Sequence, residues 1–121
     1  MAEFMTGLKR THYCGELRST DIGKEVVVCG WVQRQRDLGQ LIFIDLRDRT
    51  GIVQLAFDES TDRAIFEKAF AARAEFVLLA RGTVRERTTK NTDLPTGDIE
   101  LEDLELRVLA KSETPPFEIV E

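Results

Sequence analysis

The chain has 121 residues, of which 42% are hydrophobic and 32% are charged, and its formal net charge is −5. This length supports one ordinary domain with a real core, and the composition excludes a chain that is disordered throughout. The acidic balance excludes tight, sequence-independent phosphate binding as the main activity. No apolar run approaches the span of a membrane, and the N-terminus lacks the apolar block of a secretory signal, so we expect a cytoplasmic protein without a membrane partner.

The negative charge is concentrated towards the C-terminus. From Asp98 onward eight acidic residues stand against two basic ones. Basic residues fall instead in predicted strands or their connections, where they could line one surface: Arg34, Arg36, Arg47, Arg49, Arg81, Arg85, Arg87 and Lys90. Charge runs are more often solvated faces, so this distribution permits a nucleic-acid partner without identifying one.

Alternating apolar residues predict three strands in the first half of the chain. They run from Glu25 to Gln33, from Leu41 to Asp48 and from Ile52 to Phe57. Gly30 is a candidate bulge or sharp bend in the first strand. Residues 48–51, Asp-Arg-Thr-Gly, have the composition of a tight turn, so the second and third strands are expected to form a hairpin.

A helical period follows the third strand. Ser60 or Thr61 can cap a helix that runs to about Arg73, and its apolar stripe is expected to contact the core: Ile65, Phe66, Ala69 and Phe70. Alternation resumes from Phe76 to Arg87 and from Ile99 to about Leu109, with a polar turn-forming loop at 88–97. This order predicts an all-β fold with one helix: a five-stranded OB-fold barrel, with the helix between strands three and four.

The second strand carries an aromatic residue on its polar face. Its even-numbered residues at 42–46 are aliphatic and are expected to be buried, which leaves Phe43 and Asp45 on the solvated face. A ring there is available to stack on a nucleic-acid base. Gln54 joins this face beside or diagonal to Phe43, where its amide can donate to and accept from a base edge. For either residue alone, packing under a loop or ordinary exposure is the simpler interpretation; the pair favours base reading.

The predicted fold places further candidates around this pair. OB-folds commonly bind single strands on strands two and three, between the loops that join strands one to two and four to five. Arg34, Arg36 and Asp37 are expected in the first loop, and Arg87, Lys90 and Asn91 border the second. Glu100 projects opposite to its apolar neighbours just beyond that loop. A carboxylate repels phosphate but accepts two hydrogen bonds from guanine, so Glu100 is either a base reader or one more surface glutamate.

The chain also resembles a known family. The resemblance rests on YCGEL at 13–17, GWVQRQRDLGQLIFIDLRDRTGIVQ at 30–54, TGDIE at 96–100 and ETPPF at 113–117. These segments are similar to the N-terminal anticodon-binding domain of bacterial-type aspartyl-tRNA synthetases. Related OB-folds occur in lysyl- and asparaginyl-tRNA synthetases, and the central segment favours the aspartyl branch. The resemblance implies an N-terminal extension at 1–12, the OB-fold domain at 13–112, and at 113–121 the start of a linker to an absent catalytic domain.

The resemblance implies specific roles for the candidate residues. Phe43 would stack on the central anticodon base, a uracil, and Gln54 and Arg36 would hydrogen-bond to it. Glu100 would read the first base, guanine or its queuine derivative. Three further residues match positions near the outer anticodon bases or the backbone: Asp37, Arg87 and Asn91. The implied function is recognition of the GUC anticodon of tRNA-Asp, with the anticodon loop as partner and no DNA.

Two features depart from the family pattern, and two other residues bear on which tRNA is recognised. Gln35 replaces an arginine that is common in the family motif, and the loop before Thr96 is shortened. Leu38 and Lys90 suit an enzyme that is restricted to the aspartate tRNA.

No catalytic motif is found. The sequence has one histidine, no nucleophile–base or paired-acid arrangement, no phosphate-cradling glycine motif and no class II synthetase motif. We therefore expect neither catalysis nor a cofactor in this domain; ATP, Mg²⁺ and a homodimer are implied for the parent class II aspartate–tRNA ligase. Cys14 and Cys29 are expected to be reduced structural thiols. Two other classes stay open: a free-standing OB protein for single-stranded RNA or DNA, and an OB-fold used only for protein contacts.

Overall fold

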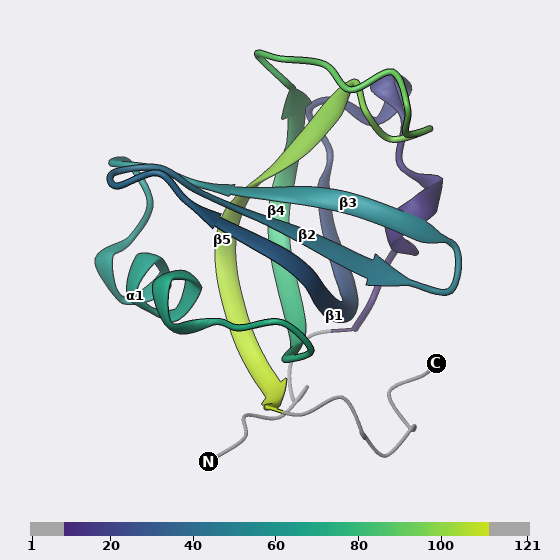
Figure 1. Cartoon of the computed structure of the whole chain (residues 1–121). Coiled ribbons are helices and arrows are strands. Elements are labelled where there is room, and N and C mark those ends of the chain that lie inside the picture. The colour runs from purple at the N-terminus through teal and green to yellow at the C-terminus, as the bar shows by residue number, and fades with distance from the viewer. Residues whose placement is uncertain (1–8, 112–121) are drawn as a thin grey trace.

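Five strands close into a barrel in the computed structural model, which describes residues 9–111 (Figure 1). They are β1 (Glu25–Asp37), β2 (Ile42–Asp48), β3 (Gly51–Phe57), β4 (Val77–Glu86) and β5 (Ile99–Ala110). Around the barrel their order is β1, β2, β3, β5, β4, and β4 pairs with β1 to close it. β3 and β5 run parallel, and the other neighbours are antiparallel. The predicted five-stranded OB-fold barrel is confirmed, with its helix α1 (Arg63–Ala71) between β3 and β4.

β1 is longer than the sequence pattern indicates. The alternation predicts an end at Gln33, but the strand continues to Asp37. Its first half pairs with β4 and its second half with β2, so the ladder continues beyond the last buried residue of the strand. Arg36 stands opposite Phe43 in this second ladder. The prediction that Arg34, Arg36 and Asp37 belong to the first loop is therefore wrong, because all three lie in β1.

The bulge in β1 also lies later than predicted. The register against β2 shifts between Val32 and Arg34, which marks an irregularity at Gln33 rather than at Gly30. Gly30 meets a different requirement. A Cβ there would lie 2.2 Å from the carbonyl oxygen of Arg47, so β1 and β2 approach this closely only because residue 30 has no side chain.

The N-terminus of α1 differs from the prediction. Asp62, and neither Ser60 nor Thr61, is the N-cap, and its side chain accepts a hydrogen bond from the backbone N–H of Ala64 at 2.9 Å. Ser60 and Thr61 instead bond to Asp58 and form the turn that leaves β3. The helix then starts later and ends at Ala71, before Arg73.

α1 lies beside the barrel (Figure 1), and its apolar stripe packs against the core. Ala69 is fully buried, and Ile65 and Phe66 pack against the barrel core. The prediction was wrong for Phe70, whose residue surface is 54% exposed. Among the stripe residues Phe70 lies furthest around the helix from Ile65, so it is at the edge of the stripe and faces away from the barrel.

The β2–β3 turn is tied to the N-terminal segment. Asp48 accepts from the backbone and the hydroxyl of Thr50, and its other oxygen accepts from the backbone N–H of Cys14 at 2.7 Å. Cys14 begins the short 3₁₀ helix η1 (Cys14–Glu16), which is followed by η2 (Ser19–Asp21). Cys14 and Cys29 are buried free thiols, as predicted. Burial, and then the neighbouring Asp48 carboxylate, raises the pKa of Cys14 well above its ordinary value, so this thiol is neutral and acts as a small apolar group.

One buried carboxyl group stands apart from these hydrogen-bonded groups. Neither oxygen of Asp103 on β5 has a hydrogen-bond partner. Burial raises the pKa of Asp103 well above its ordinary value, although the charges of Arg81 and Lys68 act in the opposite direction and Glu105 adds to the rise. The neutral form is therefore favoured in the fold, and this group opposes folding when it is ionised.

The predicted domain boundaries fall partly outside the described residues. ETPPF, the rest of the 113–121 linker and residues 1–8 of the predicted extension lie there. Within the described part, the backbone N–H groups of Thr11 and His12 donate to the carbonyl oxygen of Val27, so the end of the predicted extension is attached to β1. Across residues 9–111, α1 and the 3₁₀ helices are too short to span a bilayer.

Candidate nucleic-acid interface

Phe43 and Gln54 lie on the outer face of the β2–β3 hairpin. In the antiparallel register Phe43 pairs with Ala56 and Asp45 pairs with Gln54, so Phe43 is diagonal to Gln54, as predicted. The alternate residues Ile42, Ile44 and Leu46 are fully buried in the barrel. Phe43 is half-buried and lies outside the hydrophobic core of the described residues. The strand faces are therefore those predicted from the alternation.

Arg36 covers part of the Phe43 ring. The centre of its guanidinium lies 5.1 Å from the ring centroid, a cation–π arrangement that follows from their positions opposite each other on β1 and β2. The Arg36 Nη2 atom donates to Gln54 Oε1 at 2.7 Å and approaches Asp45 Oδ1 at 3.5 Å. The ring, the guanidinium and the amide thus form one preassembled surface. A planar base that stacks on this ring would meet the guanidinium beside it.

Gln54 is less accessible than the sequence predicts. Only 5% of its surface is exposed, and its Nε2 donates to Glu100 Oε1 at 2.8 Å. The expectation that its amide faces solvent was wrong, because β5 lies beside β3 and brings Glu100 against it. Glu100 is 46 residues from Gln54 in the chain, and the parallel pairing of β3 with β5 brings the two side chains together. The amide keeps one N–H and one carbonyl lone pair that these bonds do not use.

Glu100 is held at both of its carboxylate oxygens. Oε1 accepts from Gln54, and Oε2 accepts from Arg85 Nε at 2.8 Å. Glu100 is 6% exposed, so it is not an ordinary surface glutamate. Each oxygen retains a further lone pair, so the group can still accept two hydrogen bonds from one base edge.

Arg85 lies among three carboxylates. Besides Glu100, its Nη2 is 3.6 Å from Asp58 Oδ2 and its Nη1 is 3.8 Å from Glu102 Oε2. Burial lowers the pKa of Arg85, but the hydrogen bond to Glu100 and the charges of all three acids outweigh it and raise that pKa, so the guanidinium stays charged. Hydrogen bonds from Ser60, aided by Arg85, hold the pKa of Asp58 below its ordinary value.

We call the connected side chains Arg36, Gln54, Glu100 and Arg85 the base-edge network. At its Glu100 end, three carboxylates surround one guanidinium, so the local charge is negative and unfavourable to phosphate. An N–H donor on a base edge fits this environment. At its Arg36 end, the flat Phe43 ring adds a stacking surface. The arrangement therefore suits an unpaired base better than a nucleic-acid backbone.

Apart from Phe43, three predicted site residues lie outside this network: Asp37, Arg87 and Asn91. Asp37 accepts from the backbone N–H of Gly39 and so forms the turn after β1. Asn91 accepts from the backbone N–H of Asp93 in the β4–β5 loop. A Cβ on Gly97 would lie 1.7 Å from the Asn91 carbonyl oxygen, so this loop is tightly folded. Asp37 and Asn91 therefore shape the two flanking loops.

Two arginines present buried donors without acceptors. The Nε atoms of Arg36 and Arg87 are buried and have no hydrogen-bond partner. Such a donor costs about 1–3 kcal/mol and is uncommon in a native fold. Both arginines are on the predicted RNA-binding side, so an acceptor supplied by a ligand or by ordered water would relieve the cost.

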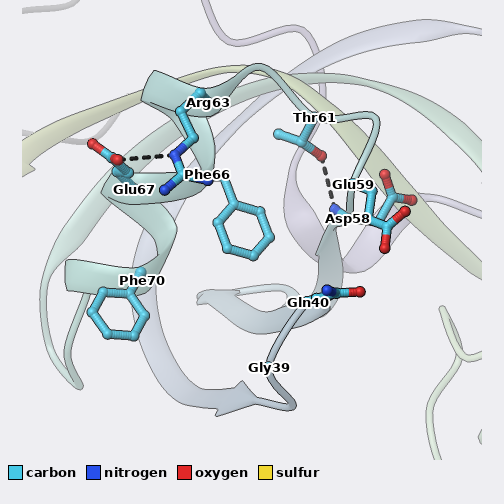
Figure 2. Close-up of a pocket in the computed structure, with 9 residues that line it drawn as sticks. All are labelled: Gly39, Gln40, Asp58, Glu59, Thr61, Arg63, Phe66, Glu67 and Phe70. Atoms are coloured by element: carbon cyan, nitrogen blue, oxygen red, sulfur yellow. Dashed lines mark hydrogen bonds and ion pairs between the residues drawn. The ribbon is translucent and has the colours of Figure 1, made fainter.

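A pocket of about 820 Å³ adjoins this region between the β1–β2 loop and α1 (Figure 2). The Phe66 ring points into it from α1, and Gln40 faces it from the loop. Its ionisable lining is mainly acidic: Asp58, Glu59 and Glu67 against Arg63, which pairs with Glu67. This charge does not favour RNA phosphates, so the pocket is a poorer candidate for RNA than the outer face of the hairpin.

Sequence reasoning found no role for Asp45 or Arg85. The alternation places Asp45 on the outer face of β2, and Arg85 on the polar face of β4. What it could not provide is the register that sets Arg85 opposite Glu100 in the β4–β5 ladder. Pairing across the barrel is a long-range property of the fold.

Comparison with known proteins agrees with the fold. Residues 26–112 match the tRNA anticodon family, described as an OB-fold nucleic acid binding domain. The aspartate–tRNA(Asp/Asn) ligase of Caldanaerobacter subterraneus is 54% identical over 98% of this chain, and the aspartate–tRNA ligase of Limosilactobacillus fermentum is 56% identical over 93%. The chain spans only 20% and 19% of the length of these two relatives.

Solved structures show the same barrel. Asparaginyl-tRNA synthetase from Pyrococcus horikoshii, complexed with asparaginyl-adenylate, superposes with a TM-score of 0.71 at 29% identity, covering 89% of this chain and 24% of that one. An OBody bound to hen egg-white lysozyme gives a TM-score of 0.77 at 27% identity, covering 86% of this chain and 96% of its own. An OB domain of this size thus exists as a separate polypeptide. The chain belongs to the tRNA anticodon family of OB-fold nucleic acid binding domains and is similar to about one fifth of an aspartate–tRNA ligase.

Proposed function

We propose that this domain recognises the GUC anticodon of tRNA-Asp. The central uracil stacks on Phe43 and hydrogen-bonds to Arg36 and Gln54, while the first base, guanine or its queuine derivative, presents its N–H edge to Glu100. Asp37 and Asn91 shape the flanking loops, and Arg87 contacts the outer bases or the backbone. No role in chemical catalysis is assigned to these residues.

The base-edge network beside the Phe43 ring is the single observation that carries this proposal. Together they place an aromatic ring, a guanidinium, a partly free amide and a doubly held carboxylate side by side on one outer face. Stacking tolerates any base, whereas the amide and the carboxylate discriminate by hydrogen-bond pattern. The negative charge around Glu100 disfavours phosphate and so directs selection to the base edge.

The proposal extends to the parent protein. The high identity to aspartate–tRNA ligases supports a class II ligase, with ATP, Mg²⁺ and the main homodimer contacts provided by the part of its relatives that this chain does not span. In such an enzyme the barrel provides one of two contacts with the tRNA. The second, tethered contact at the acceptor arm contributes the remaining affinity.

The expected affinity of this domain alone is modest. A stacked base contributes about 1–3 kcal/mol and each polar contact on the order of 1 kcal/mol, while the ordering of the anticodon loop opposes binding. We therefore expect a Kd of about micromolar or weaker. Nanomolar binding by this chain would show that the second contact is not needed.

Titration of the chain with RNA stem-loops tests the proposal. One stem-loop carries GUC and a matched one carries GCC, which changes only the central base. Weaker binding of the GCC stem-loop, by about fivefold or more, supports anticodon reading. Equal binding of both would indicate a general single-strand binder, and no binding to either would leave protein contact, as in the lysozyme-bound OBody, as the better explanation.

A further inference from the structure

The environment of Arg85 is unusual for an arginine beside an RNA-binding face. Its three guanidinium nitrogens are each directed to a different acid: Nε to Glu100, Nη2 to Asp58 and Nη1 to Glu102. A phosphate would have to compete with all three carboxylates for this one cation. Arg85 is therefore poorly suited to contact the RNA backbone, which is the usual role of an arginine on such a surface.

The same contacts fix the orientation of Glu100. The acids at 58 and 102 flank the guanidinium from the β3–α1 connection and from β5, so its plane is held from both sides. Its Nε then holds Glu100 Oε2 at 2.8 Å, while Gln54 Nε2 holds Oε1 at 2.8 Å. A carboxylate held at both oxygens cannot rotate freely. Its remaining lone pairs face a defined direction.

We propose that Arg85 is the positioning residue for recognition of the first anticodon base. This inference rests on the proposed function, since it assumes that Glu100 reads guanine. Arg85 acts only through Glu100: it keeps the carboxylate plane aligned so that both oxygens accept from N1–H and N2–H of one guanine. A base that lacks this pair of adjacent donors gains nothing from the alignment. Arg85 thus sets specificity without touching RNA.

Gln54 connects the positioning of Glu100 to recognition of the central base. Its amide bonds to Arg36 on one side and to Glu100 on the other, so the groups that read the two bases share one hydrogen-bonded side chain. A displacement of Glu100 releases one of the two bonds that orient Gln54. Loss of Arg85 is therefore expected to weaken mainly first-base discrimination, with a smaller effect on the central base.

Arg85→Gln tests the inference in the full chain. Kd is measured for stem-loops that carry GUC and AUC, which differ only in the first base. The unmodified chain should prefer GUC by about tenfold, as expected for a paired hydrogen-bond contact to a base edge. Arg85→Gln should bind GUC about tenfold more weakly and AUC almost unchanged, and Arg85→Lys, which keeps the charge, should recover part of the preference.

Arg81→Gln is the matched control. Arg81 also lies on β4, is similarly exposed, and pairs with two acids, Glu25 and Glu105, so its loss removes the same charge and a comparable set of ion pairs. This variant should retain the preference for GUC. Thermal unfolding of both variants identifies any loss due to misfolding. If Arg85→Gln does not fold, Arg85→Lys decides the question, because it should still reduce the GUC preference.

A double variant separates positioning from a direct contact. If Arg85 acts only through Glu100, Arg85→Gln should weaken GUC binding about tenfold in the unmodified chain but hardly at all in the Glu100→Gln background. Equal losses in both backgrounds, or a uniform loss for GUC and AUC, would overturn the inference and indicate phosphate binding. If the unmodified chain itself fails to distinguish GUC, AUC and GCC, the proposed function fails instead.

Discussion

Phe43→Ala separates a stacking surface from a core residue. Phe43 is half-buried and outside the core, and its described ring contact is the Arg36 guanidinium at 5.1 Å. Loss of this partly exposed cation–π contact costs about 0.5–1 kcal/mol, equivalent to a decrease in Tm of roughly 4–8 °C or less in a domain of this size. The same substitution at the fully buried Phe57 should cost about 3–5 kcal/mol.

In contrast to its small effect on stability, Phe43→Ala should have a large effect on RNA binding. A stacked base contributes about 1–3 kcal/mol, so Phe43→Ala should weaken binding of the GUC stem-loop by roughly 5- to 150-fold. Phe70→Ala is the matched control, because it removes an exposed ring from α1 that is not part of the proposed base-reading surface. Its Kd should not change. The assays are fluorescence anisotropy for binding and thermal unfolding for stability.

Two results would refute this reasoning. If Phe43→Ala destabilised the fold as much as Phe57→Ala, the ring would be a core residue. If it bound the stem-loop as well as Phe70→Ala does, the ring would not stack on the RNA.

Three further predictions concern single side chains. Glu100→Gln should weaken binding of stem-loops whose anticodon begins with guanine by about tenfold and should hardly change binding of those whose anticodon begins with adenine, as measured by fluorescence anisotropy. Equal losses for both would exclude Glu100 as the reader of the first base. Burial raises the folded-state pKa of Asp103 above its unfolded value, so its contribution to the free energy of unfolding is most favourable below about pH 4 and declines as pH rises towards the folded pKa. Asp103→Asn should therefore flatten the dependence on pH of the free energy of unfolding, measured by urea denaturation. The same pH dependence in both proteins would contradict this prediction. Gly97→Ala should weaken RNA binding and lower stability by about 1–3 kcal/mol, because its Cβ would meet the Asn91 carbonyl oxygen at 1.7 Å; a fully stable variant with unchanged affinity would show that the β4–β5 loop is not needed in this form.

The alternation of apolar and polar residues predicted the fold because this two-residue period depends only on the local sequence. The alternation around Phe43 identifies the outer face of β2 correctly, and the buried aliphatic residues identify the inner face. The same logic failed at the end of β1. There the polar run from Gln33 to Asp37 stays in the sheet because β2 provides its partners, and no local pattern shows that pairing.

The candidate site could be predicted only in part for a similar reason. Phe43 and Gln54 are neighbours in one hairpin, so their proximity follows from a short turn and a period of two. Gln54 and Glu100 meet because β3 and β5 are parallel in a closed barrel, and Arg85 meets Glu100 through a third strand. These contacts bury Gln54 and create the base-edge network. They depend on barrel closure, which sequence spacing does not determine.

The most direct test is a crystal structure of this chain bound to the GUC anticodon stem-loop. We expect the central uracil to stack on the Phe43 ring and the edge of the first guanine to lie within hydrogen-bond distance of both Glu100 oxygens, with Arg85 still paired to that carboxylate. An RNA that bound in the acidic pocket beside α1, or that contacted the barrel only through phosphates, would contradict base reading by this surface.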